Sequence, residues 1–312
     1  MFHVKQSETA TPNDAFGLDT PLAREIADLS ARRRTLDDVD VSFTGETRIL
    51  TVSNQKGGVG KTTTAVNIAS ALASLGAKVM VIDLDPQGNA STALGVPHNA
   101  ETQSIYDVLI DDVPLADILQ PSPESENLVC APSTIHLAGA EIELVSQVAR
   151  EHRLRGALNA YIEENPLDFV IIDCPPSLGL LTINAFTAAT EVFIPIQCEY
   201  YALEGLSQLL GSIQMIQKHL NPALHLSTIL LTMYDGRTRL AQQVADEVRN
   251  HFPEQVLNTV IPRSVRVSEA PSFGQTVITY DGASAGAIAY REAAVEIASK
   301  KTHSTQTQSK EN

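Results

Sequence analysis

The sequence predicts a doubly wound α/β domain, in which a mainly parallel β-sheet is flanked by helices on both faces. Short runs rich in β-branched residues alternate along the chain with longer segments of helical periodicity, as expected of such a domain. The short runs are apolar almost throughout, which indicates strands that helices cover on both faces. The chain has 312 residues, of which 43% are hydrophobic and 19% charged, enough to bury a sizeable core.

The alternation begins near residue 46 and ends near residue 300. We expect strands at residues 49–53, 78–83, 169–173, 192–197, 226–232 and 256–261. We expect helices at residues 62–75, 138–148, 153–163, 203–219, 240–251 and 283–299. Ligands of open parallel sheets bind beyond the carboxyl ends of the strands, so side chains that directly follow these strands are candidate site residues.

The two ends of the chain differ from this central region. Residues 1–45 are polar and predict a flexible arm, with one short helix at 21–34 because Leu22, Ile26 and Leu29 lie at helical spacing. A solvated or disordered segment fits this pattern, and so does a docking or DNA-contacting segment that uses the three arginines at 32–34. Residues 301–312 predict a polar tail, which leaves residues 46–300 as the folded domain.

Composition excludes several classes of protein. No stretch approaches the roughly 18–20 consecutive apolar residues of a membrane span, and the first residues lack the apolar core of a signal peptide. We therefore expect a cytoplasmic protein without membrane contact. The three cysteines, Cys130, Cys174 and Cys198, show no CxxC spacing, so buried free thiols are expected rather than disulfides or a zinc site.

The charge pattern bears on nucleic-acid binding. The net charge of −15 argues against it. However, Lys and Arg are absent from residues 79–149 and 156–217 and return in the last third of the chain. A local basic surface on an acidic protein is compatible with this distribution.

The sharpest motif lies between the first expected strand and helix, in the segment S-N-Q-K-G-G-V-G-K-T-T-T at residues 53–64. Glycines allow backbone amides to turn inward around phosphate oxygens, and the helix N-terminus adds its positive dipole end. A lysine then reaches the β- and γ-phosphates, and a threonine hydroxyl joins a Mg²⁺ shell. A plain Gly-rich turn is the alternative. The predicted nucleotide ligands are Lys56, Gly57, Gly58, Val59, Gly60, Lys61, Thr62 and Thr63.

Carboxylates follow two of the expected strands. Asp83 and Asp85 lie two apart at the end of the second strand, so they face the same side, although a capped strand-end turn would look similar. Asp173 ends a run of four apolar residues, and a buried carboxylate of this kind needs a cation. Thr62, Asp83 and Asp173 are therefore the predicted magnesium site. A nucleophilic Cys174 is disfavoured because no histidine stands at a recognisable spacing.

Together these segments resemble the deviant Walker A ATPases, and within them the ParA/Soj family. The K-G-G-x-G-K-T loop has a glutamine, Gln55, where the ordinary motif has its first glycine, and an early lysine, Lys56. The blocks D-L-D-P-Q-G-N, D-C-P-P-S, E-Y-Y-A-L-E-G, M-Y-D-G-R-T and S-E-A-P favour ParA/Soj within this class. The tail after Lys300 has no apolar residue, which disfavours the membrane-anchored MinD branch. The three cysteines give no convincing set of cluster ligands, which disfavours a nitrogenase iron protein. The resemblance spans residues 48–300.

The resemblance implies a role for each site residue. Lys56 is expected to reach the nucleotide of a second subunit, Lys61 to bind phosphates, and Asp85 to polarise the attacking water, so these three are the predicted catalytic residues. Asp83 would contact magnesium in the outer shell. Adenine contacts are implied for two further residues, Met233 and Pro262. Residues 197–205 would line the dimer face, although a simple loop-to-helix turn is an equal alternative.

The function implied is an ATPase that partitions DNA. ATP and Mg²⁺ would drive formation of a homodimer that binds double-stranded DNA without reading its sequence and associates with the nucleoid. A ParB-like partner would stimulate weak hydrolysis and release the dimer. The predicted DNA contacts, which ordinary surface arginines would also explain, are Arg237, Arg239, Arg263 and Arg266.

Two alternatives remain open. One is a ParA-like ATPase that positions another cargo, such as a chemotaxis cluster or a microcompartment. The other is a P-loop metabolic synthetase of the amidotransferase type, which would need an acceptor-substrate pocket. ATP-dependent DNA binding would argue against the synthetase.

Overall fold

The computed structural model describes residues 20–43, 45–200 and 202–300. It divides into two units, Met1–Val39 and Asp40–Asn312. The first contains helix α1 (Pro21–Asp37), which starts at a proline and is capped by the Thr20 hydroxyl, the acceptor of the Ala23 amide at 3.2 Å. The helix predicted at 21–34 is thus confirmed and is three residues longer. The predicted flexible segments at 1–19 and 301–312 lie outside the described residues.

The second unit is built on one eight-stranded sheet in the order β3-β4-β2-β5-β1-β6-β7-β8. All neighbouring strands pair in parallel except β3 and β4, which are antiparallel. The strands are β1 (Arg48–Val52), β2 (Val79–Asp83), β3 (Gln120–Pro121), β4 (Leu128–Ala131), β5 (Phe169–Asp173), β6 (Glu191–Gln197), β7 (His225–Tyr234) and β8 (Val256–Pro262). The predicted doubly wound, mainly parallel class is confirmed.

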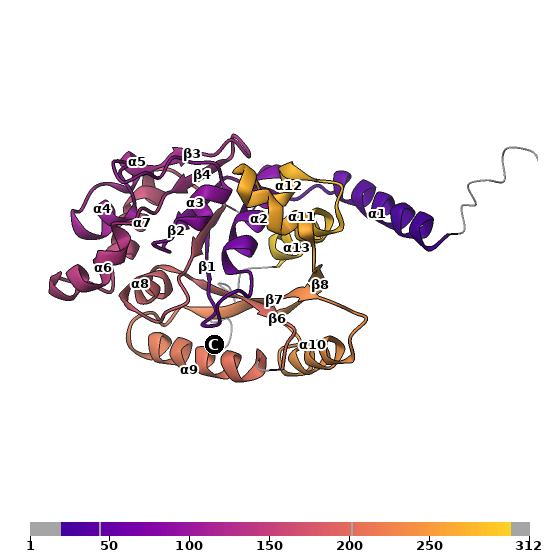
Figure 1. Cartoon of the computed structure of the whole chain (residues 1–312). Helices are drawn as coiled ribbons and strands as arrows, with labels where there is room; N and C mark the ends of the chain where they lie inside the picture. Colours follow the sequence, from indigo (N-terminus) through magenta and orange to yellow (C-terminus); the bar gives the residue numbers. More distant parts are fainter. Residues whose placement is uncertain (1–19, 44, 201, 301–312) are drawn as a thin grey trace, which may run out of the picture. The chain divides into compact units, whose positions relative to one another are not determined.

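Helices cover both faces of this sheet (Figure 1). The longer ones are α2 (Lys61–Ser74), α7 (Arg153–Glu164), α8 (Leu180–Ala188), α9 (Ala202–His219), α10 (Arg239–His251) and α13 (Ala285–Ser299). The shorter ones are α3 (Asn89–Ala93), α4 (Ile105–Ile110), α5 (Leu115–Ile118), α6 (Leu137–Glu143), α11 (Val265–Glu269) and α12 (Val277–Tyr280), with 3₁₀ turns at Leu144–Ser146 and Ala270–Phe273.

Alternate residues of each strand feed two separate hydrophobic cores, as the two-residue period of a strand requires. Ile49, Val170 and Ile172 pack with α7, α8, α9 and α10. Leu50 and Ile171 pack on the other face with α2 and α13. Helices on both faces explain why the strands are apolar throughout. All three cysteines are buried and free, as predicted, and no helix within the described ranges has the length and hydropathy that a bilayer span requires.

The six expected strands and six expected helices all form, with ends shifted by three residues or fewer except at one helix. The helix predicted at 138–148 is wrong in its second half. There α6 ends at Glu143, a 3₁₀ turn follows, and Ala149 has a φ of 51°, a left-handed conformation that no α-helix contains. Short elements such as β4 and α4 were not predicted.

A buried ion pair joins the start of the sheet to α13. The Arg48 guanidinium donates to both carboxylate oxygens of Glu191 at 2.7 Å and to the Ile297 carbonyl at 2.5 Å. Burial alone would raise the pKa of Glu191, but the hydrogen bonds and charge of Arg48 outweigh it and lower this pKa below its usual 4.5. The pair therefore stabilises the fold above a pH of about 4.5 and loses this contribution as the pH falls through the lowered value.

We expect Arg48→Met to lower the free energy of unfolding by about 3–5 kcal/mol, because it leaves the Glu191 carboxylate buried and uncompensated. The double variant Arg48→Met/Glu191→Leu should recover most of this loss, since no charge then remains buried. Urea denaturation at pH 7 measures both. Equal losses in the single and double variants would show that Arg48 acts by packing rather than by charge.

Candidate nucleotide site

The phosphate-loop motif forms the turn between β1 and α2. Helix α2 begins at Lys61 with Gly60 as its N-cap, and φ is +74° at Gly58 and +87° at Gly60. Only glycine adopts such angles without strain. The Thr232 hydroxyl of β7 donates to the Val59 carbonyl at 2.9 Å, which fixes the loop from the neighbouring part of the sheet. The loop backbone and the α2 N-terminus therefore form a site suited to phosphate.

Lys61 is held within this loop. Its side chain is largely buried, and Nζ donates to the Lys56 carbonyl at 3.3 Å. Burial lowers the pKa of Lys61, while the charges of Asp173 and Asp85 act in the opposite direction. The charges of two carboxylates at the edge of the sheet thus act on this ammonium, and a triphosphate would add more negative charge there.

Asp83 and Asp173 lie side by side at the ends of β2 and β5, as register partners, and both are fully buried. Asp83 accepts hydrogen bonds on both oxygens, from the Ser91 amide and hydroxyl at 2.8 and 2.7 Å and from the Asp85 amide at 3.2 Å. Burial raises the pKa of Asp83 to about 6. These hydrogen bonds occupy Asp83, as expected of a group that contacts a metal through water.

Asp173 has the opposite environment. Burial, followed by the charge of Asp83, raises the pKa of Asp173 well above its usual range, although the Thr62 hydroxyl and the Lys61 ammonium lower it. No group of the described residues meets the geometry of a hydrogen bond to either Asp173 oxygen. A buried carboxylate without a partner is costly, and a cation would relieve that cost.

This arrangement fits Mg²⁺ better than a metal that is held by protein ligands alone. The described residues contain no group of three or more His, Cys, Asp and Glu side chains placed to hold a metal. Mg²⁺ commonly binds one or two carboxylates and takes its remaining ligands from water and phosphates. Asp173, with the Thr62 hydroxyl close by and Asp83 beside it, can supply that carboxylate.

The other two predicted catalytic residues lie on the accessible side of the site. Asp85 is half-buried, and its Oδ1 accepts the Gln87 amide at 3.0 Å. Lys56 is exposed, and its ammonium forms an ion pair with Glu199 at 2.5 Å. Glu199 follows β6, and its carboxylate also accepts a hydrogen bond from Nε2 of the Gln197 side chain at 2.5 Å. The side chain of Lys56 is therefore turned to the segment at 197–205 that the resemblance assigns to a dimer face.

The two residues proposed for adenine lie at neighbouring strand ends. Met233 has a φ of 50° at the end of β7, and its methyl carbon lies 3.9 Å from the position that a Cβ on Gly60 would take. Tyr234 pairs with Pro262 across β7 and β8. Both candidates are thus at the carboxyl edge of the sheet, and Met233 is beside the phosphate loop.

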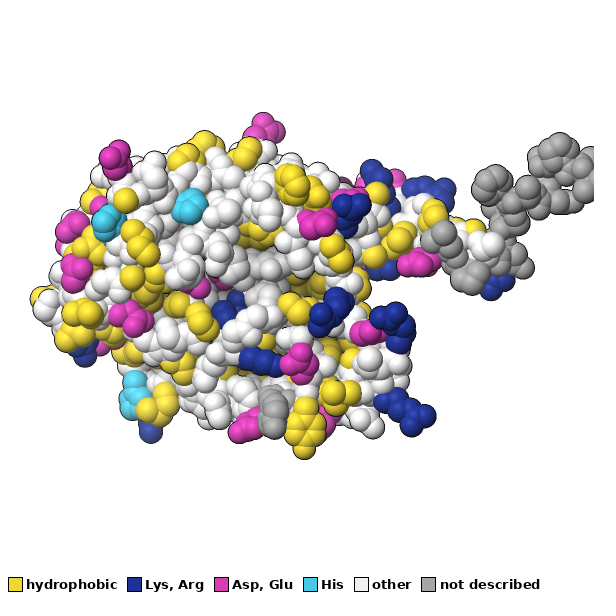
Figure 2. Space-filling view, viewed as in Figure 1, with side chains coloured by type: hydrophobic (Ala, Val, Ile, Leu, Met, Phe, Trp, Pro, Cys, Tyr) yellow, Lys and Arg dark blue, Asp and Glu magenta, His cyan; other side chains and the backbone are white. Residues whose placement is uncertain are grey.

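The four arginines proposed for DNA are exposed on loops and helix starts after β7 and β8. In Figure 2, Lys and Arg side chains gather over the α10 side of the second unit, whereas the charged side chains on the side formed by α4 and α6 are mainly Asp and Glu. Arg237 forms two 2.8 Å hydrogen bonds with Asp235 and lowers the pKa of that carboxyl to about 2. Arg266 forms ion pairs with Glu269 and Asp281.

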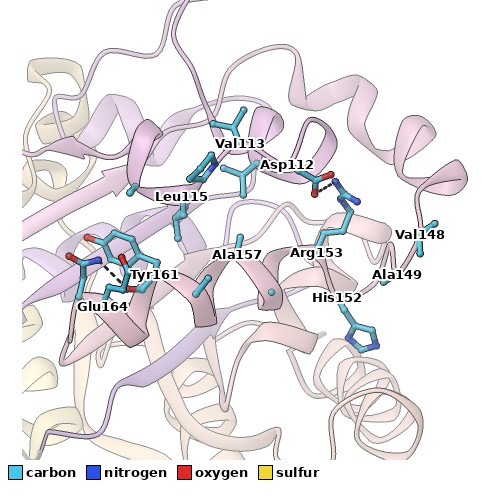
Figure 3. A pocket seen from close by; sticks show the side chains of 16 residues that line it. Asp112, Val113, Leu115, Val148, Ala149, His152, Arg153, Ala157, Tyr161 and Glu164 are labelled. Carbon is cyan, nitrogen blue, oxygen red and sulfur yellow. Dashed lines mark hydrogen bonds and ion pairs between the residues drawn. The ribbon is translucent and has the colours of Figure 1, made fainter.

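A separate cavity of about 530 Å³ lies away from this site, between α4, α5 and α7 (Figure 3). Val113, Leu115 and Tyr161 line it, and the Arg153–Asp112 ion pair closes one side. It contains none of the predicted site residues. This cavity therefore does not provide the acceptor-substrate pocket that a synthetase would require beside the phosphate loop.

Sequence reasoning missed two residues that the structure places in the site. Ser91 binds Asp83 from α3, a five-residue helix too short to give a periodic signal. Glu199 lies within a recognised block, but its contact with Lys56 spans 143 positions, which no local pattern predicts.

The topology and the phosphate loop define a P-loop ATPase of the deviant Walker A class. A family model described as an AAA domain matches residues 47–226. The chain is 54% identical over 251 residues to the sporulation initiation inhibitor protein Soj of Bacillus subtilis, which covers 80% of this chain and 98% of that protein. It is 52% identical over 243 residues to the chromosome partitioning protein ParA of Myxococcus xanthus, with 78% and 85% covered. This chain belongs to the ParA/Soj family of partitioning ATPases.

Solved structures agree on the fold and the ligands. The structure of cobyrinic acid a,c-diamide synthase from Mycobacterium smegmatis with ADP and magnesium matches with a TM-score of 0.69 and 40% identity, over 81% of this chain and 94% of that one. The same protein has been solved with an ATP analogue and magnesium. A relative of this similarity therefore holds the adenine nucleotide and the metal that the sequence predicts here.

Proposed function

We propose that this chain is a DNA-partitioning ATPase that closes into a dimer over two ATP molecules, binds DNA without sequence preference and is released by partner-stimulated hydrolysis. The observation that carries the chemistry is the buried Asp173 carboxylate, which has no hydrogen-bond partner among the described residues and lies beside Lys61. The proposed role in DNA partitioning is inferred from membership of the ParA/Soj family. Association with the nucleoid in the cytoplasm follows from DNA binding.

In this proposal each side chain acts from its observed position. The loop amides and Lys61 bind the phosphates, Asp173 and Thr62 bind magnesium, and Asp83 holds the outer shell. Bound Mg²⁺ would neutralise charge that develops on the phosphates. Asp85 orients the attacking water from the open side of the site, and Lys56 leaves Glu199 to reach the nucleotide of a second copy. Met233 and Pro262 face the adenine.

The DNA-binding part rests on the four exposed arginines. Arg237 and Arg266 are each held by carboxylates, so a DNA phosphate must compete for them. Within the described part of the chain, the side chains of Arg239 and Arg263 form no hydrogen bond and no ion pair, and Arg263 acts on Asp235 through its charge alone. We therefore expect Arg239 and Arg263 to contribute more to DNA affinity. A dimer doubles every such contact, which raises avidity.

We expect duplex DNA of random sequence to bind with ATP but not with ADP or without nucleotide. Arg263→Glu should lower the affinity and reduce the slope of log affinity against log salt by about two, since each dimer loses two phosphate contacts. Arg237→Glu should have a smaller effect. Arg155→Glu, a charge reversal on α7, is the matched control, and fluorescence anisotropy across a salt series measures all four proteins.

The results also separate the alternatives. ATP-driven dimerisation without DNA binding would contradict the partitioning proposal and favour a ParA-like ATPase for another cargo. The synthetase remains a second candidate because a relative with 40% identity carries that name. ATP turnover that requires an amide donor and an acceptor acid would favour it.

A further inference from the structure

Ser91 takes part in three hydrogen bonds at the edge of the nucleotide site. It lies on α3, is fully buried, and binds one oxygen of Asp83 through both its amide and its hydroxyl, at 2.8 and 2.7 Å. The Ser91 hydroxyl also accepts the Ser133 amide at 3.1 Å, just beyond the end of β4. A hydroxyl has one proton to donate, so the Ser133 contact leaves that proton for Asp83.

The other Asp83 oxygen leads to the residue proposed to orient water. Asp83 Oδ1 accepts the Asp85 amide at 3.2 Å, and the Asp85 side chain is fixed in turn by the Gln87 amide. Asp85, which carries this carboxylate, begins a loop, and the backbone amide of Asp85 is held by Asp83. Asp83 can hold that amide only while its own carboxylate plane is fixed, and Ser91 fixes it from the opposite side.

The neighbouring carboxylate shows that this contact is specific to Asp83. Asp173 is equally buried and is its register partner, yet neither of its oxygens has a hydrogen bond from the described residues. The fold therefore orients one carboxylate through Ser91 and leaves the other for a cation. Burial at this edge of the sheet therefore does not by itself require a carboxylate to be held by hydrogen bonds.

We propose that Ser91 is a positioning residue for ATP hydrolysis, which it serves by holding Asp83 so that Asp83 holds the Asp85 loop. The inference rests on the proposed ATPase function and adds a residue to it. Ser91 touches neither nucleotide nor water in this scheme. Its loss should therefore change the catalytic step and leave nucleotide binding nearly unchanged, because a misplaced catalytic group lowers kcat more than affinity.

The test compares kcat and KM for ATP in the full-length chain with Mg²⁺, DNA and a ParB-like stimulating partner present. S91A should lower kcat roughly tenfold, about the effect of one lost hydrogen bond to a charged group, with KM and the Kd of a fluorescent ATP analogue within about twofold. S91T, which keeps the hydroxyl, should restore kcat. S133A is the matched control, because the Ser133 hydroxyl is equally buried but has no hydrogen-bond partner in the described chain, and it should keep the wild-type kcat.

A second substitution keeps the test valid if S91A folds poorly. S91C fills the same space with a weaker donor, and its kcat should fall between those of S91A and the wild type. A wild-type kcat in S91A, an equal loss in S133A, or a loss confined to KM would each overturn the role of Ser91. Absence of hydrolysis in the wild-type chain would overturn the proposed function itself, and the role of Ser91 with it.

Discussion

Lys56→Ala is expected to lower the stimulated rate of ATP hydrolysis about 10³-fold, while the monomer still binds ATP with nearly wild-type affinity. A cation that one subunit delivers to the transition state of another contributes about 10³–10⁵ in kcat. The Lys56 ammonium pairs with Glu199 rather than with a group of the phosphate loop. Lys61, which stays inside the loop, is left to bind the phosphates.

A mixing experiment tests whether Lys56 acts across the dimer. Lys56→Ala and Asp85→Ala are each expected to be inactive alone. In a mixed dimer, the Lys56→Ala subunit keeps its own Asp85 and receives Lys56 from its partner, so one of the two sites becomes complete. Equal mixing should therefore restore about a quarter of the wild-type rate, since half of the dimers are mixed in a two-fold assembly. No recovery on mixing would show that Lys56 acts within its own subunit.

The ion pair supplies the matched control for Lys56. Both partners are roughly half exposed, with side-chain exposures of 41% and 48%, and such a pair stabilises a structure by at most about 1 kcal/mol. Glu199→Gln releases Lys56 without removing it. It should keep hydrolysis and change the ATP concentration for dimerisation by less than about fivefold, as measured by light scattering. A loss as large as that of Lys56→Ala would assign the chemistry to Glu199.

The elements predicted from sequence share one physical property, a regular pattern of burial. The strands were found because burial on both faces gives unbroken apolar runs. Helix α8 was missed for the related reason that most of its residues are buried, which removes the polar stripe that marks an amphipathic helix. Helix α4 carried a usable signal, because Ser104 and Asp107 form a capping box.

The candidate site also contains features that the sequence could predict and features that it could not. Asp173 ends β5, and Lys61 follows β1 through the phosphate loop, so a parallel sheet must bring them to one edge. The sequence could not show that Asp83 is fully hydrogen-bonded while Asp173 is not, because this depends on Ser91 and on the turn of α3. The pairing of Arg237 with Asp235 was likewise invisible, since two charges two residues apart meet only in a turn.

The unpaired carboxylate leads to the second large expected effect. Asp173→Asn should lower kcat by about 10²–10³, because it removes the charge opposite the metal and phosphates. The same change should stabilise the nucleotide-free protein. Burial and the charge of Asp83 raise the pKa of Asp173 despite the Thr62 hydroxyl and the Lys61 ammonium, so the folded chain must either keep this buried carboxylate ionised at a cost or take up a proton. An asparagine is neutral, and its amide can donate to Asp83.

Thermal unfolding separates the two effects of Asp173→Asn. Without nucleotide, Tm should rise by a few degrees, as expected for a gain of about 1–3 kcal/mol in a chain of this size. With Mg²⁺ and ATP, the wild type should gain stability through ligand binding, whereas Asp173→Asn should gain much less. Asp85→Asn is the control, because Asp85 is half-buried and hydrogen-bonded; it should lose kcat without a rise in Tm. A lower Tm for nucleotide-free Asp173→Asn would mean that the carboxylate supports the fold rather than straining it, and the argument for a cation at this position would fail.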